Sequence, residues 1–185
     1  MKTQKGISLI KLVIIIAVIL FLFILLFGDS DNSNTTNPSS TSQSSTETLK
    51  VGDTWTVDGQ WKLTINSVTT TSYRNPYSDY KPAQVVYISY SYENLGYYDN
   101  FYDEDMLYFA LDPDVETTVI DSNGEVAYSY PGEDGGAKEI PTGAKCMNAT
   151  SCIGLNNVSD TITLTISKYD GNETKQKVQY KLDVK

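Results

Sequence analysis

The side chains that most enzymes use for proton transfer or metal binding are scarce in this chain. It contains no histidine, so the commonest general base and the commonest metal ligand are both absent. Ser78 and Lys81 have the spacing at which a lysine can activate a serine on a helix. Pro82 follows directly and disfavours that helix. We therefore expect a protein that is not an enzyme and that has no cofactor and no metal site.

Cys146 and Cys152 are the residues with redox chemistry. Their spacing is not the Cys-x-x-Cys of redox enzymes. On one continuous strand they would lie about 20 Å apart at ~3.3 Å per residue, whereas a disulfide needs Cα atoms within about 7 Å. A disulfide therefore requires the chain to reverse, and residues 148–151 (Asn-Ala-Thr-Ser) can form the turn. We expect a structural disulfide, with two unpaired thiols as the alternative.

Acidic residues are concentrated between positions 99 and 116. Clustered carboxylates are the ligands that Ca²⁺ prefers. However, the spacing of an EF-hand loop is missing, and residues 121–124 (Asp-Ser-Asn-Gly) match only a fragment of it. A solvated acidic loop is the default interpretation, and calcium binding is the alternative.

Tyrosines are the strongest candidates for ligand binding. Many lie between residues 73 and 108 among Asn, Asp, Ser and Gly, a composition typical of recognition loops. Six lie in irregular sequence, and we expect these to be exposed and to contact a carbohydrate or a protein of the cell envelope: Tyr73, Tyr77, Tyr80, Tyr97, Tyr98 and Tyr102. The alternative is that their rings only cover the open end of a small sandwich.

Alternating apolar and polar residues predict the strands that position these side chains. Residues 61–65, 85–92, 161–166 and 177–184 each alternate with the period of two that is typical of a strand with one buried face. Turn-forming pairs such as Asp58-Gly59 and Asp170-Gly171 separate them. No stretch beyond residue 49 has a helical period. The fold expected for residues 50–185 is an all-β, antiparallel sandwich.

The order of these segments resembles a known bacterial family. Its turns and strands match the following stretches: Val51-Gly52-Asp53, residues 61–68, residues 85–94, the hairpin at 120–124 leading to Tyr128, and Ile140-Pro141-Thr142-Gly143. The pattern is similar to the "domain of unknown function 4352" family of extracytoplasmic, telokin-like immunoglobulin-fold domains. The resemblance implies an immunoglobulin-like fold behind an N-terminal membrane anchor, and it implies no reaction.

The N-terminus predicts a membrane anchor. Residues 12–27 are all apolar, and the helix expected over residues 7–27 would be about 31 Å long, close to the ~30 Å of a bilayer core. Lys2, Lys5 and Lys11 precede the apolar run, which predicts that residues 1–6 lie in the cytoplasm and the C-terminal domain outside the cell membrane. A cleaved secretory signal would have a shorter apolar run and a small-x-small site.

Composition describes the rest of the chain. Residues 28–49 are rich in Ser and Thr with almost no apolar side chains, so they predict a disordered linker. An O-glycosylated stalk is the alternative reading of that linker. The first eleven residues carry three lysines and no acid. The remaining residues therefore carry a net charge of −12, which gives −9 for the whole chain. This acidity excludes nucleic acid as a partner. The sequence therefore predicts a single-pass, non-catalytic binding module of the cell envelope.

A second resemblance supports a different function. Residues 5–17 (KGISLIKLVIIIA) look like a type IV pilin leader, which would be cut between Gly6 and Ile7. The departure is Lys11, which occupies the position where pilins carry a glutamate. A pilin-like or pseudopilin-like subunit is therefore the alternative function.

The position of the mature N-terminus separates these two functions. We predict that the mature protein begins at Met1 or the next residue, because a lysine at position 11 would place like charges together where pilin packing needs opposite ones. N-terminal sequencing of membrane-extracted protein measures this. A methylated Ile7 at the first position would favour the pilin-like alternative instead.

Overall fold

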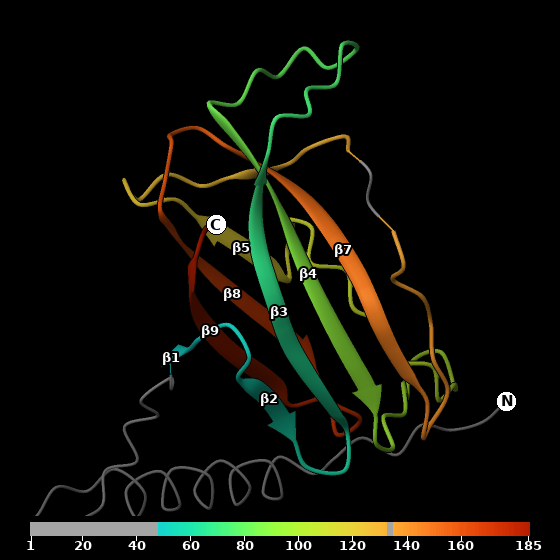
Figure 1. Cartoon of the computed structure of the whole chain (residues 1–185). Helices are drawn as coiled ribbons and strands as arrows, with labels where there is room; N and C mark the ends of the chain where they lie inside the picture. The colour runs from blue at the N-terminus through green and yellow to red at the C-terminus, as the bar shows by residue number, and fades with distance from the viewer. Residues whose placement is uncertain (1–47, 133–134) are drawn as a thin grey trace, which may run out of the picture. The chain divides into compact units, whose positions relative to one another are not determined.

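The computed structural model describes residues 48–132 and 135–185, which form two β-sheets and no helix (Figure 1). One sheet has the order β1-β9-β8-β5 and contains β1 (Thr48–Leu49), β9 (Lys175–Asp183), β8 (Thr161–Tyr169) and β5 (Thr117–Ile120). The other has the order β2-β3-β4-β7-β6 and contains β2 (Thr54–Val57), β3 (Trp61–Thr71), β4 (Gln84–Asn94), β7 (Lys145–Leu155) and β6 (Tyr128–Ser129). The prediction of an all-β, immunoglobulin-like sandwich is confirmed.

The strands follow the alternation of the sequence. Ile162, Leu164 and Ile166 of β8 are buried between the sheets, and the threonines between them face outward. Strands β3 and β9 present their apolar residues to the same core. One pairing differs from the expectation: Thr48 and Leu49, at the end of the expected linker, form β1 and pair in parallel with β9.

Two β-bulges change the phase of this alternation. On β3 the register shifts between Ile65 and Ser67, so the next core residue is Val68. On β7, Tyr90 pairs with Ala149 but Tyr92 pairs with Cys146, so β7 has one extra residue. A bulge leaves one residue unpaired and reverses which face the following side chains occupy.

The cysteines show the effect of the second bulge, and the expected disulfide is wrong. Residues 148–151 continue β7 and form no turn, so about 20 Å of strand separates Cys146 from Cys152. Cys146 lies in the main core, whereas Cys152 contacts Val85 and Tyr130 in a second buried cluster on the other face of the sheet. The two thiols do not form a disulfide with one another.

The long connections lie at opposite ends of the sandwich. Residues 72–83 join β3 to β4 at one end, and residues 95–116 leave β4 at the other end and cross to β5 in the second sheet (Figure 1). The second connection contributes Leu107, Phe109 and Leu111 to the core.

Asn94, the last residue of β4, organises the start of that second connection. Its side chain is fully buried, and its amide nitrogen donates to the carbonyls of Asp105 (2.8 Å) and Ile140 (3.1 Å). Its oxygen accepts from the backbone N–H groups of Gly96 (3.0 Å) and Tyr97 (2.8 Å). One side chain thus fixes three backbone segments.

The N-terminal predictions fall outside this part of the chain. The expected membrane helix at 7–27, the linker up to residue 47 and the candidate processing site at Gly6 and Ile7 are not among the described residues. Within residues 48–132 and 135–185, no helix is long and apolar enough to cross a membrane.

The two thiols should react separately. We predict that natively exported protein, unfolded with iodoacetamide and without reductant, adds two carbamidomethyl groups, because the two cysteines are too far apart to bond. Intact-mass spectrometry gives the result. One intrachain link between Cys146 and Cys152 would mean that β7 is not continuous.

Asn94→Ala should destabilise the domain by about 3 kcal/mol, because it removes four hydrogen bonds to the backbone, two of them fully buried. Urea unfolding followed by the fluorescence of the buried Trp55 and Trp61 measures this. Asn66→Ala is the matched control, since Asn66 is exposed and accepts one 3.3 Å bond from Ser91, and it should cost less than about 0.5 kcal/mol. Equal losses in the two variants would contradict the role given to Asn94.

Candidate ligand-binding site

The six candidate tyrosines do not form one surface. Tyr73, Tyr77 and Tyr80 lie in the 72–83 connection, and the other three lie in the 95–116 connection at the opposite end. Their exposure also differs from the expectation that all six are exposed. Tyr77 is 94% exposed, whereas Tyr97 is only 6% exposed and belongs to the core. Tyr73, Tyr98 and Tyr102 are exposed, and Tyr80 is half-buried.

Tyr80 holds the 72–83 connection against the sheet. Its hydroxyl lies 3.2 Å from the carbonyl of Gly154 and 2.9 Å from Oδ1 of Asn156, and its ring contacts those of Tyr128 and Tyr130 edge-on. A Cβ atom at position 154 would lie 2.6 Å from this ring, so Gly154 makes the close approach possible. Tyr80 therefore packs on the second buried cluster, which contains Val85, Tyr130 and Cys152.

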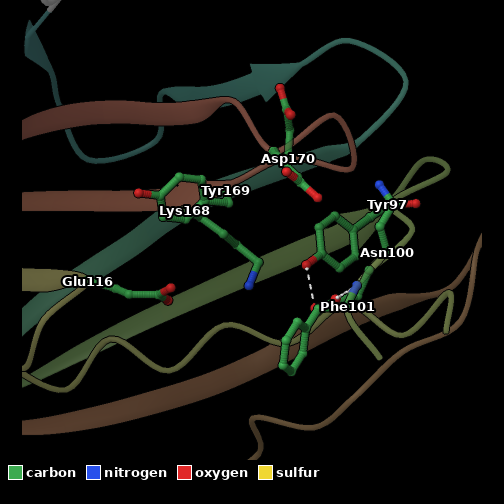
Figure 2. A pocket seen from close by; sticks show the side chains of 9 residues that line it. Tyr97, Asn100, Phe101, Glu116, Lys168, Tyr169 and Asp170 are labelled. Carbon is green, nitrogen blue, oxygen red and sulfur yellow. Dashed lines mark hydrogen bonds between the residues drawn. The ribbon is translucent and has the colours of Figure 1, made fainter. Parts of the chain in front are cut away.

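A pocket of about 520 Å³ lies at the opposite end. Three segments line it: residues 97–101 of the second connection, Glu116 just before β5, and residues 168–173 where β8 turns into β9. Figure 2 shows Lys168 extending into the pocket between Glu116 and Tyr97. Among the candidate tyrosines, only Tyr97 lines it.

Lys168 stands at a core-facing position of β8. The inward residues of this strand are Ile162, Leu164 and Ile166, and Lys168 follows in the same register. Its Nζ lies 5.3 Å from the ring centre of Tyr97 and 5.5 Å from that of Phe109, both cation–π distances. Burial lowers the pKa of Lys168, and the nearby charges of Glu116 and Asp99 partly offset this.

The rings beneath Lys168 belong to a larger aromatic cluster. Trp61 contacts Tyr97 (5.8 Å between ring centres) and Phe109 (5.9 Å), and Trp55 contacts Trp61 (5.4 Å). These edge-to-face contacts are the favoured arrangement for aromatic pairs. The pocket floor is therefore the end of the packed core, which fixes the position of the ammonium group.

Gly171, in the turn between β8 and β9, is bound to the second connection and to the turn between β2 and β3. Its N–H donates to Oε1 of Gln60 (2.9 Å), and its carbonyl accepts from the side-chain amide of Asn100. A Cβ atom at position 171 would lie 2.9 Å from the carbonyl oxygen of Tyr98, so a larger residue would separate the loops.

Two of the four carboxylates in the pocket have structural partners. Asp99 accepts from the hydroxyl of Tyr97 (3.2 Å) and from the N–H groups of Phe101 (2.9 Å) and Tyr102 (3.1 Å). Asp170 accepts from Asn172 and Thr174 and from Gln176, and these hydrogen bonds, that of Thr174 first, lower its pKa. Burial, together with the charge of Asp99, raises the pKa of Tyr97 to about 12.

The other two carboxylates, Glu116 and Glu173, are exposed. Considering only the residues that the structure describes, neither carboxylate has a hydrogen-bond or ion-pair partner. Phe101 stands at the pocket with 85% of its surface exposed. The ring of Tyr169 lies on the opposite face of β8 from Lys168, where Nζ of Lys175 is 5.7 Å from its centre. The pocket thus offers one exposed aromatic ring, hydrogen-bond acceptors and one ammonium donor.

Acidic residues of the segment 99–116 accept hydrogen bonds from backbone groups of their own turns. Asp99 supports its own turn, and Asp114 accepts from the N–H groups of Glu116 and Thr117. In the described part of the chain, no three acidic or cysteine side chains are grouped as ligands for a metal ion.

Sequence reasoning missed most residues of the pocket. The signal for Lys168 was present, because the alternation of residues 162–166 continues by two residues to a lysine. Phe101 and Tyr169 had no such signal, because the connection after β4 and the end of β8 line the same pocket only once the two sheets pack together.

Comparison with known proteins gives the fold. No protein-family model matches the sequence, and no curated protein sequence matches it. The solved structures that are similar include the following two. A secreted protein from Mycobacterium tuberculosis, MPT63, is 14% identical with a TM-score of 0.51, covering 74% of this chain and 96% of that protein. The yjhA protein from Bacillus subtilis is 18% identical with a TM-score of 0.47, and the match covers 73% of this chain and 99% of that protein. The likeness to MPT63 shows a shared β-sandwich fold.

Proposed function

We propose that this protein is a membrane-tethered, non-catalytic module that binds a carbohydrate of the cell envelope in the pocket beside Lys168. The observation that carries the proposal is the exposed ring of Phe101 at a pocket that also holds two exposed carboxylates and an ammonium group. Sugar rings have apolar C–H faces that pack on aromatic rings and hydroxyls that both donate and accept.

The size and lining of the pocket support a small polar ligand. Its volume of about 520 Å³ lies within the range of known ligand sites. Lys168 donates to a ligand oxygen, and Glu116 and Glu173 accept from ligand hydroxyl or amino groups. The walls are held in place by Asp99, Asp170 and the contacts at Gly171, so little ordering is needed when the ligand binds.

The absence of catalysis is part of the proposal. Asp99 and Asp170 accept backbone hydrogen bonds that shape their own turns, so their carboxylates serve the loops. The location is proposed from the lysines before the apolar run at 12–27, which place the domain outside the cell. The MPT63 protein, which shares the fold, is described as secreted, and this supports the same side of the membrane.

The test is binding of cell-wall oligosaccharides to full-length protein in nanodiscs, measured by isothermal titration calorimetry. Phe101→Ala should weaken binding about tenfold, because it removes the ring that packs on the sugar. Tyr77→Ala is the matched control, since Tyr77 is a similarly exposed ring at the other end of the domain and should leave the affinity unchanged.

Three outcomes would contradict the proposal. Loss of binding in Tyr77→Ala alone would move the site to the 72–83 connection. Binding of a purified envelope protein and of no oligosaccharide would make the module a protein receptor. Cleavage of a bound oligosaccharide would make the protein an enzyme.

A further inference from the structure

We infer that the pocket selects a protonated amino sugar of the glucosamine type over the N-acetylated sugar of the same length. This inference rests on the proposed function and names its ligand class. It depends on the arrangement of the charges and the exposed ring in the pocket, above all on the two exposed glutamates.

The pocket carries an excess of negative charge. Four carboxylates and one ammonium group line it, which leaves a formal charge of −3. A sugar that bears a carboxylate would gain one attraction, to Lys168, and would meet repulsion from the rest. A neutral sugar would gain nothing from the excess charge, and a sugar that bears an ammonium group would gain from it.

The carboxylates that already accept hydrogen bonds within the protein determine where the ligand's amino group can bind. Asp99 and Asp170 already accept several hydrogen bonds, so they have little capacity left. Glu116 and Glu173 are the exposed carboxylates that accept no hydrogen bond from the described residues, and Glu116 is also attracted to the ammonium group of Lys168. They come from different segments of the pocket lining, the residue before β5 and the β8–β9 turn.

Lys168 prevents the ligand's amino group from binding at the floor. Its own ammonium group already lies over the rings of Tyr97 and Phe109, where a ligand cation would otherwise bind. A second cation is therefore directed to the glutamates, while Lys168 donates to a hydroxyl or ring oxygen. Phe101 takes the apolar face of the sugar, which simple cations lack.

The experiment compares two tetrasaccharides, one of glucosamine and one of N-acetylglucosamine, binding to full-length protein in nanodiscs at about pH 6. Exposed charge pairs are each worth up to about fivefold in affinity. With two glutamates available, the glucosamine tetramer should bind about tenfold more tightly. This preference should shrink at high salt, where exposed charges are screened, and at about pH 9, where the sugar amine is neutral.

Variants identify the groups responsible. Glu116→Gln and Glu173→Gln should each weaken binding of the glucosamine tetramer about threefold to fivefold. They should weaken the N-acetylated tetramer less, because Gln can still accept from a hydroxyl but carries no charge. Glu139→Gln is the matched control, since Glu139 is an exposed glutamate outside the pocket and should change neither affinity. Thermal unfolding of each variant shows that the fold is retained.

The outcomes separate this inference from the proposed function. If the two tetramers bind equally well and both depend on Phe101, the pocket binds sugars but does not select the amine, and the inference is wrong. If neither tetramer binds, the inference is wrong, and the proposed function loses its support from these sugars. If tetralysine binds as tightly, with the same dependence on Glu116 and Glu173, the site is a general cation surface and the inference is also wrong.

Discussion

The ammonium group of Lys168 sets the boundary between the core and the pocket. Strand β8 delivers apolar side chains to the core at every second position, and the next inward position belongs to a lysine. A buried ammonium group needs compensating interactions, and here two rings and two nearby carboxylates supply them. The sheets cannot close over this charge with another apolar layer, so this end of the sandwich stays open as a pocket.

Polar side chains at this end act mainly on the backbone. Asn94 binds four backbone groups, Asp99 binds two, and Asp170 binds the N–H groups of its own turn. Each interaction shapes a loop that has no strand partner of its own. Because these bonds are made within the protein, the pocket walls are formed before a ligand arrives.

The sequence predicts the parts of this structure that local patterning controls. The alternation in residues 161–166 and 177–184 places β8 and β9 and their buried faces correctly. The bulge on β7 is different, because it depends on how β4 and β7 pair, and no local signal marks it. The disulfide prediction failed because residues 148–151 continue β7 as a strand, whereas two cysteines six residues apart suggested a reversal of the chain. The pocket, which joins residues 97–101 to 168–173, likewise depends on long-range pairing.

The tyrosines show why composition alone does not define a binding surface. Tyr80, Tyr90 and Tyr97 have the same side chain as Tyr77, yet the first three each donate a hydroxyl hydrogen bond within the domain. A tyrosine in a small sandwich can bury its ring and still satisfy its hydroxyl at the edge of the core. Abundant tyrosine therefore reflects, in part, a core that ends close to solvent. The residues left for recognition are those, such as Phe101, whose rings are exposed beside the charged groups of the pocket.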